Sequence, residues 1–153
     1  MPGLAPFIFR RALVALSGDT VDSAVVRLAI ETARHGHGGN AELVGLHVVQ
    51  VAWSIALDDD MVGQSSDIQR VLDAADQTVD AAHMTMKTVL VQARNVGAAI
   101  VDEACAREAD LIIVGLPHQS HFGEDSVGHV VAYVLRHAQC AVWVVREPII
   151  DEV

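Results

Sequence analysis

The chain has 153 residues, of which 52% are hydrophobic and 20% are charged. This is the size and composition of one folded domain and excludes a disordered chain. Twenty acidic residues against ten basic ones give a formal charge of −10, which argues against nucleic acid or anionic lipid as a partner, because both are bound by neutralising phosphates with Lys and Arg.

Apolar runs and helical stripes alternate along the chain. Runs of strand length lie at residues 12–16, 43–49, 86–93, 111–115 and 141–145. Between them, apolar residues recur with the period of a helix at residues 21–35, 68–84, 97–109 and 128–137. The alternation predicts an α/β fold, a single doubly wound domain with a five-stranded parallel sheet and helices on both faces. No linker divides the chain, so residues 1–153 are expected to form one domain.

The most uniformly apolar strands, residues 12–16 and 111–115, are expected at the sheet centre because such strands are covered on both sides. Ligands of a doubly wound sheet bind beyond the carboxyl ends of its strands, where the winding direction switches. That crevice would be lined by residues 17–19 and 115–118, with the helix that begins at Gly128 offering its free amides to an anion. The alternative is that both loops are only tight turns.

Several of these segments resemble one known family. Residues 111–115, Gly128 and residues 134–145 are similar to the C-terminal half of the universal stress protein family, and Leu46-His47-Val48 resembles its second strand. The similarity covers about residues 10–146. It implies the sheet order 3-2-1-4-5 and a homodimer through the last strand, which begins at Ala141 and ends at Val145.

Many members of that family bind ATP with the motif G-x2-G-x9-G-[ST]. The residues that the resemblance assigns to an adenine-nucleotide site are Ala15, Ser17, Val48, Val114, Gly115, His118, Gly128, His129 and Val130.

The motif is altered in this chain. Gly115 and Gly128 keep their separation, but His118 and His129 replace its second glycine and its hydroxyl residue. Pro117 has no N–H to donate, and Ser17 stands where the family has an acidic residue.

Two acidic residues, Glu124 and Asp125, precede the helix where a triphosphate would sit and would repel it. The sequence therefore predicts a pocket for ATP with weakened affinity, or for a smaller or less charged adenine ligand. The alternative is an interaction or regulatory domain of the same fold that binds no nucleotide.

No residues form a convincing catalytic set, so the sequence predicts a non-enzymatic binding or regulatory module of the stress response. The histidines of residues 118–129 have no zinc-site spacing, and we expect no metal beyond a nucleotide-bound Mg²⁺. His47, inside an apolar strand, is predicted to be structural. Cys105 and Cys140 are predicted to be buried small hydrophobes.

The longest stretch without a charge, residues 43–57, is too short and too polar to cross a bilayer. The apolar N-terminus carries its arginines after the apolar run rather than before it, unlike a signal peptide. We therefore expect a cytoplasmic location and no membrane insertion.

Overall fold

The computed structural model describes residues 9–35, 40–52, 65–116 and 128–148. Its elements, in chain order, are β1 (Arg11–Leu16), α1 (Val21–His35), β2 (Glu42–Gln50), α2 (Ser65–Ala81), β3 (Met86–Ala93), α3 (Val96–Ala106), β4 (Leu111–Leu116), α4 (Gly128–His137) and β5 (Ala141–Arg146). The predicted alternation of strands and helices is confirmed.

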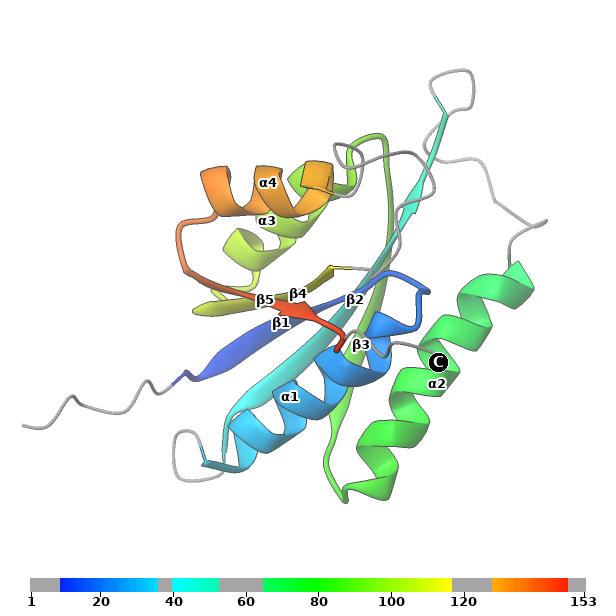
Figure 1. The fold of residues 1–153 in the computed structure, drawn as a ribbon, viewed down its shortest axis with the longest axis vertical. Coiled ribbons are helices and arrows are strands. Elements are labelled where there is room, and N and C mark those ends of the chain that lie inside the picture. The colour runs from blue at the N-terminus through cyan, green and yellow to red at the C-terminus, as the bar shows by residue number, and fades with distance from the viewer. Residues whose placement is uncertain (1–8, 36–39, 53–64, 117–127, 149–153) are drawn as a thin grey trace, which may run out of the picture.

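The strands form one parallel sheet in the order β3-β2-β1-β4-β5. This confirms the predicted topology and places β1 and β4 inside the sheet. Helices α1 and α2 cover one face, and α3 and α4 cover the other (Figure 1). Each described helix connects two parallel strands, so it begins near the carboxyl edge of the sheet.

Each face of the sheet has its own core, because successive side chains of a strand point to opposite faces. Val14 of β1 is buried with Val25 of α1 in one cluster. Leu13, its neighbour, is buried with Ile100 of α3 and Val134 of α4 in the other. Because helices cover both faces of β1 and β4, these strands have continuous apolar sequences rather than alternating ones.

Two helices end earlier than their sequence patterns predict. Helix α2 ends at Ala81 and α3 at Ala106, whereas the apolar periods extend to residues 84 and 109. His83 (φ 58°) and Glu108 (φ 55°) have left-handed backbone conformations that stop these helices. Glycine usually occupies such a position. Because His83 and Glu108 are not glycines, the sequence pattern did not indicate that the helices end there.

None of the helices in these described ranges has both the length and the apolar character needed to cross a membrane.

Candidate functional site

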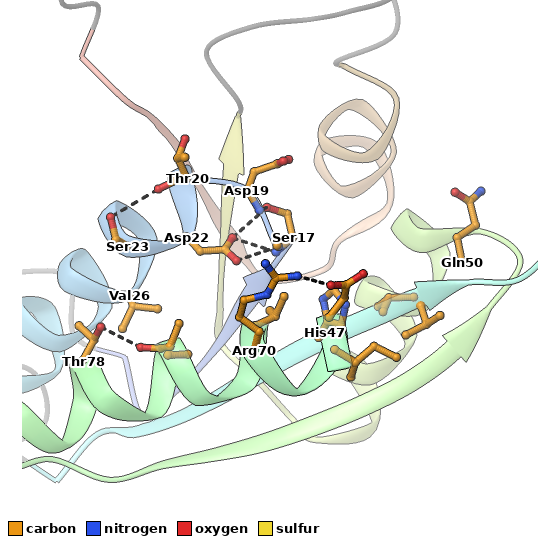
Figure 2. A pocket seen from close by; sticks show the side chains of 18 residues that line it. Ser17, Asp19, Thr20, Asp22, Ser23, Val26, His47, Gln50, Arg70 and Thr78 are labelled. Carbon is orange, nitrogen blue, oxygen red and sulfur yellow. Dashed lines mark hydrogen bonds and ion pairs between the residues drawn. The ribbon is translucent and has the colours of Figure 1, made fainter. Parts of the chain in front are cut away.

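A cavity of about 630 Å³ opens above the carboxyl ends of β1 and β2, between α1 and α2 (Figure 2). Four segments contribute to it: the loop after β1, the first two turns of α1, the end of β2 and one side of α2 from Asp67 to Thr78. Its described lining consists of Ser17, Gly18, Asp19, Thr20, Asp22, Ser23, Val26, His47, Val48, Val49, Gln50, Asp67, Ile68, Arg70, Val71, Ala74, Ala75 and Thr78. The cavity thus combines an apolar floor with polar groups at its rim.

The loop after β1 is held by a carboxylate of the helix that follows. Asp22 accepts hydrogen bonds from the backbone N–H of Ser17 (2.8 Å), the hydroxyl of Ser17 (2.9 Å) and the backbone N–H of Gly18 (2.8 Å). Gly18 has φ +90°, a conformation that side-chain-bearing residues rarely adopt. The loop amides form an anion-binding nest, and the side chain of Asp22 fills it.

His47 is fixed by the neighbouring strand. Its Nδ1 lies 2.8 Å from the carbonyl oxygen of Leu16. Because a carbonyl can only accept, Nδ1 carries a hydrogen, and Nε2 is the ring nitrogen left for another partner. His47 is therefore a satisfied structural histidine, as predicted, and it also lines the cavity, which the sequence did not indicate.

The rim of the cavity is mostly acidic. Asp19, Asp22 and Asp67 line it, and Arg70 is the only Lys or Arg among its described lining residues. Arg70 forms an ion pair with Asp67 one turn away on α2, and the two side chains are 75% and 70% exposed. An ion pair this exposed contributes little to folding, so its guanidinium can exchange partners at low cost.

The structure brings together two of the residues that the sequence assigned to a nucleotide site. Ser17 and Val48 both line the cavity. Ala15, Val114 and Val130 pack in the core between the sheet and the α3–α4 layer, and Val48 also packs against this core. His118, Pro117, Glu124 and Asp125 lie outside the described residues.

The three remaining assigned residues lie on β4 and at the start of α4. A Cβ on Gly115 would come within 2.8 Å of Val21 on α1, so close packing alone accounts for this glycine. Gly128 opens α4, and among the described residues no side chain or other element lies within 4 Å of such a Cβ; His129 is exposed. None of the three is among the described lining of the cavity, so a nucleotide contact through them stays a prediction.

Sequence reasoning missed the contribution of α2. Its apolar stripe correctly predicted a helix packed on the sheet, with Ala75 and Val79 buried. No sequence motif marked Arg70 and Asp67 as cavity residues, because their position over the cavity depends on how α2 packs beside α1.

The two cysteines line a second cavity, of about 330 Å³, between α3 and the segment before β5. The prediction that both are buried is wrong: Cys105 is exposed and Cys140 is half-buried. Residues 100 and 104 of α3 face the core at a spacing of four, which turns position 105 toward the helix edge. Burial raises the pKa of the Cys140 thiol, a backbone hydrogen bond opposes the shift, and Asp110 adds to it.

Within the ranges that the structure describes, no three His, Cys, Asp or Glu side chains are grouped closely enough to hold a metal ion. The histidine-rich segment of residues 118–127 lies outside these ranges.

A comparison with protein families matches residues 8–146 to the Universal stress protein family. The chain belongs to the universal stress protein family. The resemblance drawn from its strand and loop residues is thereby confirmed over almost the same span.

Solved structures of other universal stress proteins share the fold of this stress protein. UspA from Lactobacillus plantarum is 23% identical, with a TM-score of 0.74 over 92% of this chain and 100% of its own. A universal stress protein in complex with cAMP is 23% identical (TM-score 0.68, 91% and 98% covered). The universal stress protein from Archaeoglobus fulgidus in complex with dAMP is 20% identical (TM-score 0.66, 90% and 98% covered). No curated protein matched the chain.

Proposed function

We propose that this universal stress protein is a non-enzymatic regulatory module that binds an adenine nucleotide in the cavity above β1 and β2. One observation carries the proposal: the cavity joins Ser17 and Val48, which family resemblance assigns to the nucleotide, at the carboxyl ends of adjacent parallel strands. Parallel α/β sheets bind their ligands at this edge. Structural neighbours in complex with cAMP and dAMP support an adenine ligand.

The chemistry of the cavity suits a nucleoside. Val49 and Ile68 offer apolar surface to a base, while the Nε2 of His47 and the hydroxyls of Ser23 and Thr78 offer hydrogen bonds. A mostly apolar cavity with a few placed polar groups is the usual form of a small-molecule site. No Mg²⁺ ligand set beyond the nucleotide's own phosphates is part of the proposal.

Mass spectrometry of the denatured, freshly purified protein tests whether an adenine nucleotide co-purifies.

Calorimetric titration with AMP then tests where the nucleotide binds. Ala74 lines the cavity, and Ala74→Trp fills it with a bulky side chain. The matched control is Ala81→Trp, an exposed alanine at the far end of the same helix. We expect Ala74→Trp to lose at least about tenfold in AMP affinity, equal to 1.4 kcal/mol, and the control to bind normally. Equal binding by both variants would place the ligand elsewhere.

One observation favours the second candidate, a regulatory domain of the same fold without a nucleotide. Asp22 occupies the amides of the loop after β1 with its own carboxylate, so this nest is closed to a phosphate. Under this candidate the purified protein carries no nucleotide, and calorimetry shows no heat of binding with AMP, adenosine or ATP.

The proposal includes a homodimer through β5. Among the described strands, β5 pairs with β4 alone, so it is an edge strand of the sheet. The other edge strand, β3, carries Lys87 and Gln92, whereas β5 is apolar up to Arg146. Apolar edges associate unless they are covered or paired.

A further inference from the structure

We propose that Arg70 recognises the phosphate of the bound nucleotide and that the cavity selects a ligand with one phosphate over a triphosphate. This inference rests on the proposed function and adds to it a specificity-determining residue and a ligand class. It follows from where the positive and negative charges of the cavity lie.

Arg70 is placed to meet an anion. It lies on the second turn of α2, and Figure 2 shows its side chain extending from that helix toward Ser17 in the loop after β1 and Asp22 in the first turn of α1. A guanidinium has five N–H donors in a planar fork. One nitrogen of Arg70, Nη2, bonds Asp67, and its other donors have no partner within the described part of the chain.

The backbone N–H groups of the loop after β1 are already occupied. The N–H groups of Ser17 and Gly18 both donate to Asp22, and the N–H of Asp19 donates to the hydroxyl of Ser17 at 3.2 Å. A phosphate that enters the described cavity therefore finds Arg70 as its one charged donor. Arginine suits this role because its fork can bind a phosphate through two parallel hydrogen bonds.

The carboxylates set the limit on ligand charge. Asp19, Asp22 and Asp67 outnumber Arg70 by three to one around the cavity. A single phosphate can displace Asp67 from Arg70, and the exposed ion pair costs little to break. A triphosphate has one guanidinium for several negative charges, and its remaining phosphates would face the carboxylates.

The test compares AMP, adenosine and ATP in calorimetric titrations of the native protein, Arg70→Gln and Arg27→Gln. Arg27 is an exposed arginine of α1 that does not line the cavity, so its variant controls for the loss of one positive charge. We expect the native protein and Arg27→Gln to bind AMP about tenfold more tightly than adenosine, and ATP more weakly than AMP. In Arg70→Gln the AMP-to-adenosine ratio should fall to about one, with adenosine affinity unchanged.

Asp67→Asn provides a test in the opposite direction. It frees the guanidinium of Arg70 and removes one carboxylate, so AMP should bind several-fold more tightly while adenosine binds as before.

An Arg70→Gln variant that keeps the native AMP-to-adenosine ratio overturns the role of Arg70 and leaves the proposed function standing. ATP binding more tightly than AMP overturns the selection of one phosphate. If the native protein binds neither AMP nor adenosine, the proposed function fails, and this inference fails with it.

Discussion

Asp22 shows how one side chain can occupy the backbone amides of a neighbouring loop. The sequence placed Ser17 and Asp19 at a ligand-binding edge, and both residues line the cavity there. It did not show that a carboxylate five residues after Ser17 would fold back onto the loop amides. Such a contact depends on the exact turn between β1 and α1, which residue types alone do not fix. At the residue scale, sequence therefore pointed to two residues of the cavity lining and left the hydrogen bonds of the loop unknown.

The cysteines provide a test at the same scale. Because burial raises the pKa of Cys140, its thiolate fraction near pH 7 is below that of a free cysteine, and the thiolate is the reactive form. We expect iodoacetamide to label the exposed Cys105 before Cys140, with the Cys140 rate still rising at pH values above the range of a free thiol. Peptide mass spectrometry of timed samples measures both rates.

The variant Cys105→Ser is the control for that experiment. It should leave only the slow Cys140 labelling, with an unchanged pH profile. Labelling of Cys140 at the rate of a free cysteine near pH 8 would show that its thiol is open to solvent.

At the scale of elements, Gly115 allows α1 to pack closely against β4. A Cβ at this position would lie 2.8 Å from Val21 Cγ1 and 3.0 Å from Val25 Cγ2, and both branched side chains are buried. We expect Gly115→Ala to lower the free energy of unfolding by about 1–3 kcal/mol, the usual cost of overpacking a core. Urea unfolding followed by circular dichroism measures this change.

Gly45 on β2 is the matched control for Gly115. Its added Cβ would lie 2.8 Å from the terminal methyl of Met86, which is the flexible end of a long side chain. Gly45→Ala should therefore cost clearly less than Gly115→Ala. Equal costs would indicate that the loss comes from a shared property of strand glycines rather than from the contact of β4 with α1.

A second prediction at this scale concerns Asp76 on α2. Partial burial raises its pKa above the ordinary 3.8, and the carboxylates of Asp80 and Asp73 raise it further. The native state thus holds this proton more tightly than the unfolded chain does. Stability is then lost as the pH rises from about 3.8 through the native pKa. Asp76→Asn should stabilise the protein near pH 7 by a few tenths of a kcal/mol, the size of such helix charge pairs.

The gain from Asp76→Asn should shrink as the pH falls toward 4 and as salt screens the neighbouring carboxylates. Urea unfolding at two pH values and two salt concentrations checks both trends. Asp102→Asn, an exposed acidic residue of α3, controls for the loss of one negative charge. A gain for Asp102→Asn equal to that of Asp76→Asn would point to net charge alone.

The elements also show which parts of the fold were predictable. Hydrophobic periodicity located every described strand and helix, because burial of one face or both governs where apolar residues fall. Helix ends were less accurate, since His83 and Glu108 take up conformations that sequence patterns expect of glycine. The order of the strands came from family resemblance rather than from the pattern itself, which is compatible with several doubly wound orders.

At the scale of the whole molecule, the candidate site is less predictable than the fold. The rule that ligands bind beyond the carboxyl ends of strands pointed to Ser17, and family resemblance pointed to Val48; both residues line the cavity. The described lining of the cavity lies over β1 and β2 and beneath α2, while residues 117–127 after β4 lie outside the described residues. Arg70 and Thr78 could not be predicted because helix packing brings them over the sheet, and no local motif encodes that packing.

The dimer is a property of the whole molecule, and its test lies on β5. The exposed large apolar side chains include Val144 on β5 (41% exposed) and Leu135 on the helix packed beside it (56%). Two copies related by a twofold axis would pair their β5 edges and bury these side chains, in the isologous manner of most homodimers. We expect sedimentation of the native protein at micromolar concentrations to show a dimer, and Val144→Lys to give a folded monomer.

Two further variants separate an interface effect from loss of the fold. Leu90→Lys changes an exposed side chain (45%) on the opposite edge strand, β3, and should leave the dimer intact. Trp143 faces the other side of β5 and packs against the core cluster beneath α1, so Trp143→Lys should lower the stability of the monomer itself. A dimer that survives Val144→Lys but dissociates in Leu90→Lys would move the interface to β3. A native protein that sediments as a monomer would remove the homodimer from the proposed function, because the apolar edge of β5 would then be tolerated without a partner.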